Sequence, residues 1–193
     1  MPRLSPSHDK PKVSTTMTTN EALQGKPLHQ CVIDIMRPAL EIYAFWRDPT
    51  NLPKFMKHLK SIEVRSPTVS HWRWRALKDK VEVTWESEIV QDVPGSLISW
   101  RTIGDSQVAH EGWVTFIEQP FNRGTFVKIQ LAYDPPGGTL THWLEKILGE
   151  SPETTLRDDL RRLRQLMEVG ELATIEGQPQ GGEEPKTNPT LHH

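Results

Sequence analysis

The sequence predicts an α+β fold in which a curved antiparallel sheet of about seven strands surrounds a long C-terminal helix. Between residues 29 and 134, runs with a hydrophobic period of two alternate with short segments rich in Pro, Gly, Asp, Asn and Ser, a pattern typical of antiparallel hairpins. After residue 138 the period becomes that of a helix. Because no crossover helix separates consecutive strands, a parallel α/β sheet is excluded.

Length and composition indicate one domain with a tail at each end. Of the 193 residues, segments 1–28 and 170–193 contain few large apolar side chains, so we expect flexible tails around a domain at 29–169. The net charge of -2 argues against nucleic acid as a partner. Cys31 is the single cysteine, which excludes an internal disulfide. Without a signal-like or membrane-spanning segment, the expected location is cytoplasmic.

The elements follow in a simple order. The first strand is expected at 29–36, followed by a short helix bounded by Pro38 and Asp48-Pro49 and a second short helix or turn at 51–59. Six more strands are expected at 60–66, 70–76, 80–91, 96–103, 107–119 and 124–134. A first helical segment at 140–148 precedes the terminal helix, which Ser151 caps and whose apolar stripe is Leu156, Leu160, Leu163 and Met167.

Alternation also assigns the two faces of the sheet. Glu82, Glu86 and Glu88 lie on the wet side of their strand. The expected buried face consists of Trp72, Trp74, Ala76, Val81, Val83, Trp85, Ser87, Ile89, Ile98, Trp100, Thr102, Val127, Ile129, Leu131 and Tyr133. The strand containing Trp113 is ambiguous, because two alternating sets compete for the buried face: Gly112, Val114 and Phe116 against Trp113, Thr115 and Ile117.

Several segments within 29–169 resemble a known family. They are residues 46–59 with Asn51-Leu52-Pro53-Lys54-Phe55-Met56, then His71-Trp72-Arg73-Trp74, Trp85-Glu86-Ser87-Glu88-Ile89, Ile98-Ser99-Trp100-Arg101, Gly112-Trp113-Val114-Thr115-Phe116 and Tyr133-Asp134-Pro135. Together they resemble the polyketide cyclase/dehydrase and coenzyme Q-binding family of the START/Bet v 1-like (SRPBCC) superfamily. The resemblance implies a helix-grip fold whose cavity holds a lipid, an isoprenoid quinone, a polyketide or another apolar molecule, for transport in some members and for ring closure or aromatisation in others.

Aromatic residues of the buried face are the candidates for the walls of such a cavity. The chain has seven tryptophans, each with a wide apolar face and one N–H donor. The same residues could instead pack a core, since aromatic residues favour strands. The candidate ligand-binding residues are Trp72, Trp74, Trp85, Ile98, Trp100, His110, Val114, Phe116, Ile129, Leu131, Tyr133 and Trp143.

The sequence contains no recognisable catalytic motif. A nucleophile elbow, a Gly-rich phosphate loop and histidine pairs at metal-binding spacing are all missing, so we predict neither a cofactor nor a metal. If the cavity is catalytic, His110 and Tyr133 are the candidate proton handlers. Each could equally be a satisfied polar group in a core.

Two groups of residues suggest partners other than a small-molecule ligand. Arg157, Arg161, Arg162 and Arg164 could contact RNA, but Asp158 and Asp159 among them favour a salt-bridged solvent face. Trp143 could make transient contact with a membrane surface during ligand exchange or simply pack in the core.

Three functions are therefore considered. The first is binding or transport of a hydrophobic ligand, the second is a cyclase or dehydratase that uses the same cavity, and the third is an interaction module for ribosomes or membranes. The lack of an inward-facing acid and base pair favours the first. The placement of His110 could reverse that preference.

Overall fold

A computed structural model describes residues 28–76, 80–106, 109–134 and 151–170. Its elements, in chain order, are β1 (Leu28–Ile35), α1 (Ala39–Arg47), η2 (Pro49–Lys54), β2 (Leu59–Val64), β3 (Val69–Ala76), β4 (Val81–Val93), β5 (Leu97–Ile103), β6 (Ala109–Glu118), η3 (Pro120–Asn122), β7 (Thr125–Asp134) and α3 (Pro152–Val169). The predicted order of strands and helices is confirmed. The helix expected at 140–148 and both expected tails, apart from Leu28 and Gly170, lie outside the described residues.

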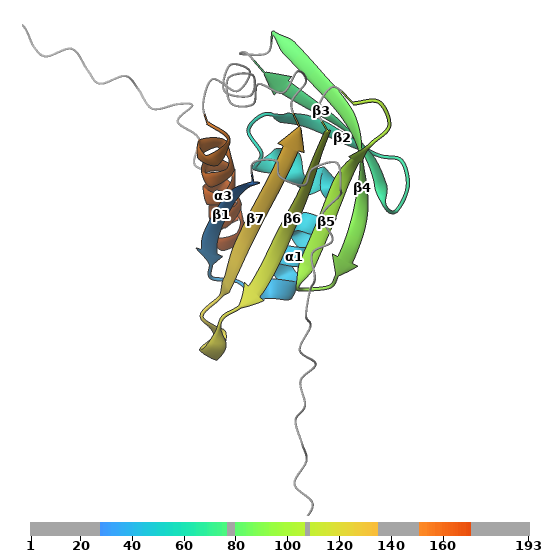
Figure 1. The fold of residues 1–193 in the computed structure, drawn as a ribbon. Coiled ribbons are helices and arrows are strands. Elements are labelled where there is room, and N and C mark those ends of the chain that lie inside the picture. Colours follow the sequence, from blue (N-terminus) through green and yellow to red (C-terminus); the bar gives the residue numbers. More distant parts are fainter. Residues whose placement is uncertain (1–27, 77–79, 107–108, 135–150, 171–193) are drawn as a thin grey trace, which may run out of the picture.

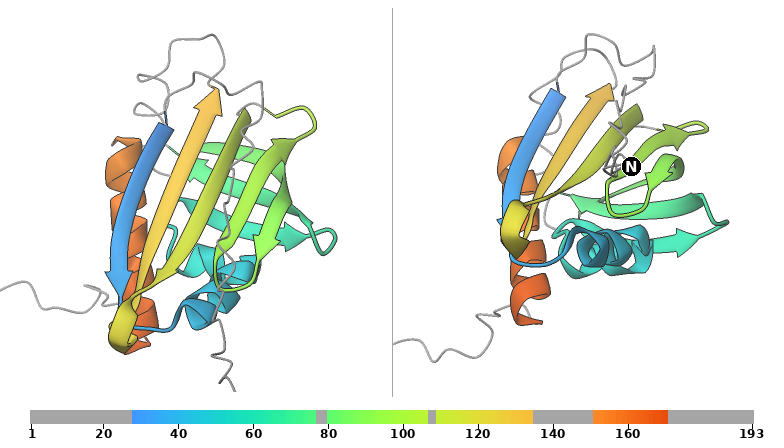
Figure 2. Two further views of the ribbon diagram at one scale, coloured as in Figure 1. Left: turned by 60° about the horizontal axis from the view of Figure 1, so that its bottom comes forward. Right: turned by 90° about the horizontal axis from the view of Figure 1, so that it is seen from below.

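The seven strands form one antiparallel sheet with the order β1-β7-β6-β5-β4-β3-β2 (Figure 1). Strands β2 to β7 make a meander, and β1 pairs with β7 at the edge. Register shifts interrupt the pairing between Ile89 and Gln91 on β4 and between Leu59 and Ser61 on β2. Such irregularities increase the local bend of a strand. Figure 2 shows the resulting curvature, with α1 inside the curved sheet and α3 along the β1 edge.

The concave face is filled by α1 and by the C-terminal half of α3. Ile42 is fully buried on α1, and the rings of Tyr43 and Trp46 lie 6.0 and 6.4 Å from that of Phe116 on β6. Leu160 and Leu163 of α3 are buried in the same core. At about 1.5–3 kcal/mol for each fully buried aliphatic side chain, this packing is sufficient to hold both helices on the sheet.

Local sequence explains where the helices begin and end. Asp48 precedes Pro49 and lies outside the helical region, so α1 ends at Arg47. Helix α3 begins after Ser151, whose hydroxyl accepts a hydrogen bond from the N–H of Thr154, and Pro152 occupies the first turn as predicted. At its other end, Gly170 adopts the left-handed conformation with φ of 88°.

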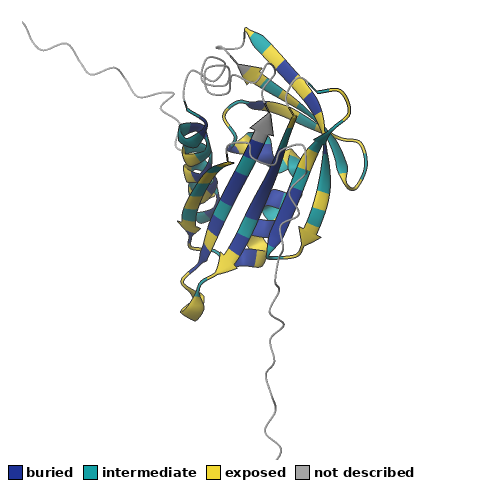
Figure 3. Cartoon of the chain, in the orientation of Figure 1, coloured by how far each residue is buried: buried dark blue, intermediate teal, exposed yellow. Residues whose placement is uncertain are grey.

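The structure resolves the ambiguous phase of β6. Val114 faces the main core with Ile98 and Ile129, whereas Trp113 packs on the opposite face of the sheet with Leu97 and Ala132. Bands of buried and less buried residues alternate along the strands in Figure 3, except where β5 and β6 are buried on both faces. The set containing Gly112, Val114 and Phe116 is therefore the inner one. Within the described part of the chain, no helix is both long and apolar enough to cross a bilayer.

Candidate ligand-binding cavity

A cavity of about 480 Å³ lies between the sheet and the elements that cover it. Its walls come from the concave face of β3 to β7, from η2 and the segment that follows it, from the β2–β3 hairpin and from the first turns of α3. This volume is within the range of 300–1,000 Å³ typical of small-molecule sites.

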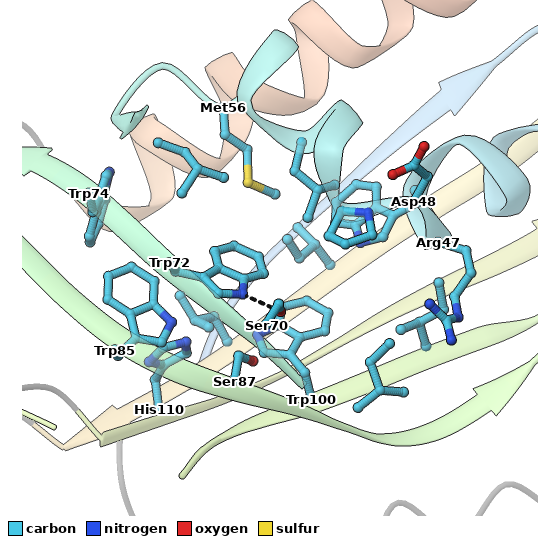
Figure 4. Close-up of a pocket in the computed structure, with 18 of the residues that line it drawn as sticks. Arg47, Asp48, Met56, Ser70, Trp72, Trp74, Trp85, Ser87, Trp100 and His110 are labelled. Atoms are coloured by element: carbon cyan, nitrogen blue, oxygen red, sulfur yellow. Dashed lines mark hydrogen bonds between the residues drawn. The ribbon is translucent and has the colours of Figure 1, made fainter. Parts of the chain in front are cut away.

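Three tryptophans and a histidine gather at one end of the cavity, which we call the tryptophan end (Figure 4). Trp72 and Trp85 are cross-strand partners whose rings stack at 5.8 Å with an angle of 24° between them. Trp74 and His110 meet the ring of Trp85 edge to face, at 5.9 and 5.1 Å. Both arrangements are favoured by the ring quadrupole. The ring of Trp85 is therefore held on three sides.

Polar groups at the tryptophan end are few. The indole N–H of Trp72 donates to Ser70 Oγ at 2.8 Å, and Nδ1 of His110 is hydrogen-bonded to Thr102 Oγ1 at 2.7 Å. Ser87 is buried, and its hydroxyl donates to the carbonyl of Arg101 at 3.4 Å. The indole N–H of Trp85 is buried and has no hydrogen-bond partner. These groups fix the side chains of Trp72 and His110 but leave Trp85 with an unused donor.

Another part of the wall is apolar and comes from the end of α1, from η2 and from the residues that follow η2. Trp46, Leu52 and Phe55 are buried, and the rings of Trp46 and Phe55 lie 5.3 Å apart. Asp48 holds η2 in place, since its side chain accepts from the N–H and the hydroxyl of Thr50 at 3.0 and 2.7 Å. The same hydrogen bonds lower the pKa of Asp48 below its ordinary value.

A small polar cluster of Tyr43, Arg47 and Asp92 lies beside the cavity. Arg47 donates from Nε to Asp92 Oδ2 at 2.6 Å and from its terminal nitrogen to the carbonyl of Pro67 at 2.9 Å, so it joins α1 to β4 and to the β2–β3 turn. Tyr43 donates its hydroxyl to Asp92. Burial and this hydrogen bond raise the pKa of Tyr43 to about 12. Burial would raise the pKa of Asp92, but the hydrogen bonds from Tyr43 and Arg47 outweigh it and the pKa is lowered.

The charged side chains on the described part of the wall are already engaged. Arg47 binds Asp92, Asp48 caps η2, and Asp159 accepts the N–H of Lys57 at 2.9 Å. Glu82, Glu86 and Glu88 lie on the other face of β4, where Glu82 and Glu88 pair with Lys60 and Arg101 at 3.0 Å. The titratable group left at the tryptophan end is His110. The arrangement favours binding of an apolar molecule over acid–base work by carboxylates.

The structure brings most of the predicted site residues to the cavity. Eight of them line its wall: Trp72, Trp74, Trp85, Ile98, Trp100, His110, Ile129 and Leu131. Val114 and Phe116 are buried in the main core, where Phe116 packs against Tyr43 of α1, and neither of them lines the cavity. Tyr133 pairs with His110 through the β6–β7 ladder, but its side chain lies outside the described residues, as does the whole of Trp143.

Sequence reasoning missed the covering elements. Their cavity-lining residues are Trp46 from α1, Leu52 from η2, Phe55 and Met56 from the segment after it, Leu59 from β2, Val64, Ser66, Pro67, Thr68, Val69 and Ser70 from the β2–β3 hairpin, and Pro152, Thr155, Leu156 and Leu160 from α3. The spacing of apolar residues in 52–59 could have indicated an inward face. Nothing in the sequence of the Ser66-Pro67-Thr68 turn distinguishes it from an ordinary hairpin turn. For metals, the described residues contain no group of three or more His, Cys, Asp or Glu side chains that could hold an ion.

Comparison with known proteins places this geometry in a wider group. Residues 35–161 match a family model described as polyketide cyclase / dehydrase and lipid transport. A crystal structure of a protein from Deinococcus radiodurans is 34% identical, with a TM-score of 0.61, and the match covers 76% of this chain and 100% of that one. An uncharacterized 17.2 kDa protein of Streptomyces lincolnensis is 27% identical over 136 residues, which cover 70% of this chain and 86% of that protein.

More distant structures share the fold. A START superfamily protein from Mycobacterium smegmatis has a TM-score of 0.61 at 10% identity, over 75% of this chain and 99% of that one. The di-domain ARO/CYC protein BexL of the BE-7585A biosynthetic pathway has a TM-score of 0.58 at 21% identity, over 74% of this chain and 50% of BexL. These likenesses confirm the predicted helix-grip fold.

Proposed function

Because the chain belongs to the polyketide cyclase/dehydrase and lipid transport family, we propose that it binds an apolar small molecule in the cavity and holds or carries it without chemical change. The observation that carries this proposal is the cavity of about 480 Å³ with three tryptophans at one end. Tryptophan offers more apolar contact area than any other side chain, and such walls suit a flat or hydrophobic ligand.

The chemistry of the wall supports the same function. Most of the side chains that line the cavity are apolar. Water in such a site gains few hydrogen bonds from the wall, whereas a bound apolar ligand releases that water and adds contacts with the lining side chains.

Native mass spectrometry of the gently purified protein tests the proposal. We expect a stoichiometric apolar adduct on the wild-type chain. Leu156→Trp, which fills the cavity from α3, should lose the adduct. Leu166→Trp is the matched control, because Leu166 is a half-buried leucine on the same helix that does not line the cavity. A wild-type protein without an adduct, or an adduct that remains on Leu156→Trp, would contradict the proposal.

A cyclase or dehydratase remains the second candidate, favoured by one observation. His110 lies on the cavity wall with its Nδ1 hydrogen-bonded to Thr102 Oγ1, as a general base held in one orientation would be. The predicted partner Tyr133 pairs with it across the β6–β7 ladder. Turnover of a poly-β-ketone by the wild-type chain, with loss of turnover in His110→Ala, would establish this function in place of the first.

A further inference from the structure

A second group of buried side chains lies on the convex face of the sheet, away from the cavity. Leu97 of β5, Trp113 of β6 and Ala132 of β7 pack together there and are 2%, 5% and 4% exposed. The polar side chains beside them on the same face are also buried, and they are Ser99, Glu111 and Gln130. We call these six residues the convex patch.

The sheet alone does not bury side chains on this face. Ile117 of β6 and Phe126 of β7 are cross-strand partners on the same face, and they are 50% and 42% exposed. Trp113 precedes Ile117 by four residues on the same strand and has a larger side chain, yet it is buried. The convex patch therefore has a cover that Ile117 and Phe126 lack.

The described helices do not provide this cover. The buried residues of α1 and of the C-terminal half of α3 belong to the main core on the concave side (Figure 2). Among the residues that the structure describes, no helix lies over the convex face of β5, β6 and β7 (Figure 1). The cover therefore comes from one of the three longer parts of the chain outside them: the N-terminal segment (1–27), the β7–α3 connection (135–150) or the C-terminal segment (171–193).

The position of β1 favours the N-terminal segment. Leu28 begins β1 and is the register partner of Ala132, so the chain before Leu28 leaves the sheet beside the convex patch. Neighbouring strands are about 4.8 Å apart, which places β6 about 10 Å and β5 about 14 Å from β1. Leu23 can lie up to about 17 Å from Leu28. Its side chain is therefore within reach of Trp113, and Gly25 and Pro27 are residues at which a chain readily turns.

The other two segments are less well placed. The C-terminal segment follows the end of α3, where the carbonyl of Met167 accepts a hydrogen bond from Arg37, beyond the far end of β1. The β7–α3 connection is held at both ends, and it must arrive at Ser151, from which α3 runs along the cavity. Only the N-terminal segment of these three is held at a single end that lies beside the convex patch.

From this arrangement we infer that the N-terminal segment folds back over the convex face and docks on the convex patch, with Leu23 packed against Trp113. The gain is the removal of indole and leucine surface from water. The two faces of the sheet then have different occupants, since the helices and the cavity lie on the concave face and a piece of the same chain lies on the convex face. A partner protein or a second copy is thereby kept off the convex patch.

Fluorine NMR of the full-length protein labelled with 5-fluorotryptophan tests this inference. The resonance of Trp113 is identified by its loss in Trp113→Phe, and its shift between H₂O and D₂O reports contact of the ring with solvent. We expect almost no isotope shift for Trp113 in the wild-type protein. Leu23→Asp should show the full shift of an exposed indole, because a carboxylate is not buried on an apolar ring without a partner.

Leu4→Asp is the matched control, because it makes the same change in the same segment at a residue far along the chain from β1. The ring of Trp113 should stay protected in this variant. Loss of protection in both variants would contradict the contact between Leu23 and Trp113. Protection that survives Leu23→Asp would assign the cover to another segment and overturn the inference.

Two further outcomes would also overturn the inference. A full isotope shift in the wild-type protein would show that the convex patch has no cover, and protection that disappears on dilution would show that a second copy covers it. None of these results bears on ligand binding, since the cavity lies on the other face of the sheet.

A second measurement needs no variant. In the wild-type protein, a nuclear Overhauser effect should connect the methyl groups of Leu23 with the indole protons of Trp113. The methyl groups of Leu4 should show no such effect. Overhauser effects to Trp113 that come only from residues of the β7–α3 connection or of the C-terminal segment would overturn the inference.

Discussion

The indole of Trp100 lies directly on the backbone of Gly112, its cross-strand partner between β5 and β6. A Cβ atom added at position 112 would be 2.3 Å from Cζ2 and 2.6 Å from Cε2 of that ring. The glycine therefore allows the ring to approach the backbone of β6 closely, and the same ring lines the cavity. A missing side chain on one strand thus sets the position of an aromatic wall on the next.

Gly112→Ala should push the ring of Trp100 into the cavity and weaken ligand binding. We expect a loss of about 1–3 kcal/mol in the free energy of unfolding, the usual cost of forcing extra volume into a packed site. Denaturant titration of a double-mutant cycle with Trp100→Leu checks the cause, because the second substitution removes the clashing ring atoms. An equal cost of Gly112→Ala in both backgrounds would show that the clash is not responsible.

The Tyr43–Arg47–Asp92 cluster predicts an acid-dependent contribution to stability. The pKa of Asp92 is lowered in the folded chain, so its contribution is present above the unfolded pKa of about 4 and is lost as the pH falls through the folded value. Asp92→Asn should therefore destabilise the protein at pH 7 by about 1 kcal/mol, since the pair with Arg47 is partly exposed. The difference in free energy of unfolding from wild type should shrink as the pH falls below 4.

Asp158→Asn is the control for this pH series, because Asp158 pairs with Arg161 at 3.3 Å on an exposed part of α3. Such a pair contributes little, and no comparable pH dependence is expected. A constant difference between wild type and Asp92→Asn from pH 7 to pH 3 would contradict the role of the ionised carboxylate.

The hydroxyl of Tyr43 should ionise unusually late. Burial and the hydrogen bond to Asp92 raise its pKa to about 12, so the stability that depends on the neutral phenol is present below pH 10 and is lost between pH 10 and 12. The chain has two tyrosines. The difference in ultraviolet absorbance between wild type and Tyr43→Phe during alkaline titration therefore isolates Tyr43. A midpoint near 10 in protein that circular dichroism shows to be folded would refute the prediction.

The sequence predicts those features of this architecture that depend on residues close together in the chain. The succession of strands along the chain follows from the alternation of polar and apolar residues and from the turn residues between them. The capped start of α3 follows from Ser151-Pro152. These signals act over a few residues. The phase of β6 does not follow, since Trp113 and Val114 are both buried, on opposite faces. Alternation of polar and apolar residues distinguishes a solvent-exposed face of a strand from a buried one. It is uninformative where both faces are buried.

The same distinction between local and distant contacts applies to the candidate site. Trp72, Trp74, Trp85 and Trp100 were found from the alternation of their strands, which assigns side chains to a face. The depth of the cavity depends on where η2 and α3 lie on that face, and therefore on contacts between distant segments such as the N–H of Lys57 with Asp159. That the N–H of Trp85 lacks a partner while that of Trp72 has one is a matter of tertiary geometry, which the two identical side chains cannot reveal in sequence.

His110 decides between the two proposed functions. As part of a binding wall, its ring contributes edge-to-face packing on Trp85 at 5.1 Å, so His110→Phe should keep a stoichiometric ligand with affinity within about threefold of wild type. As a general base it would contribute roughly 10²–10⁴ in rate, and the same variant would abolish turnover of a poly-β-ketone.

Thr102→Val sharpens the comparison, because it removes the oxygen hydrogen-bonded to Nδ1 of His110. A binder should tolerate that change, whereas a base that relies on Thr102 for its orientation should lose kcat with little change in KM.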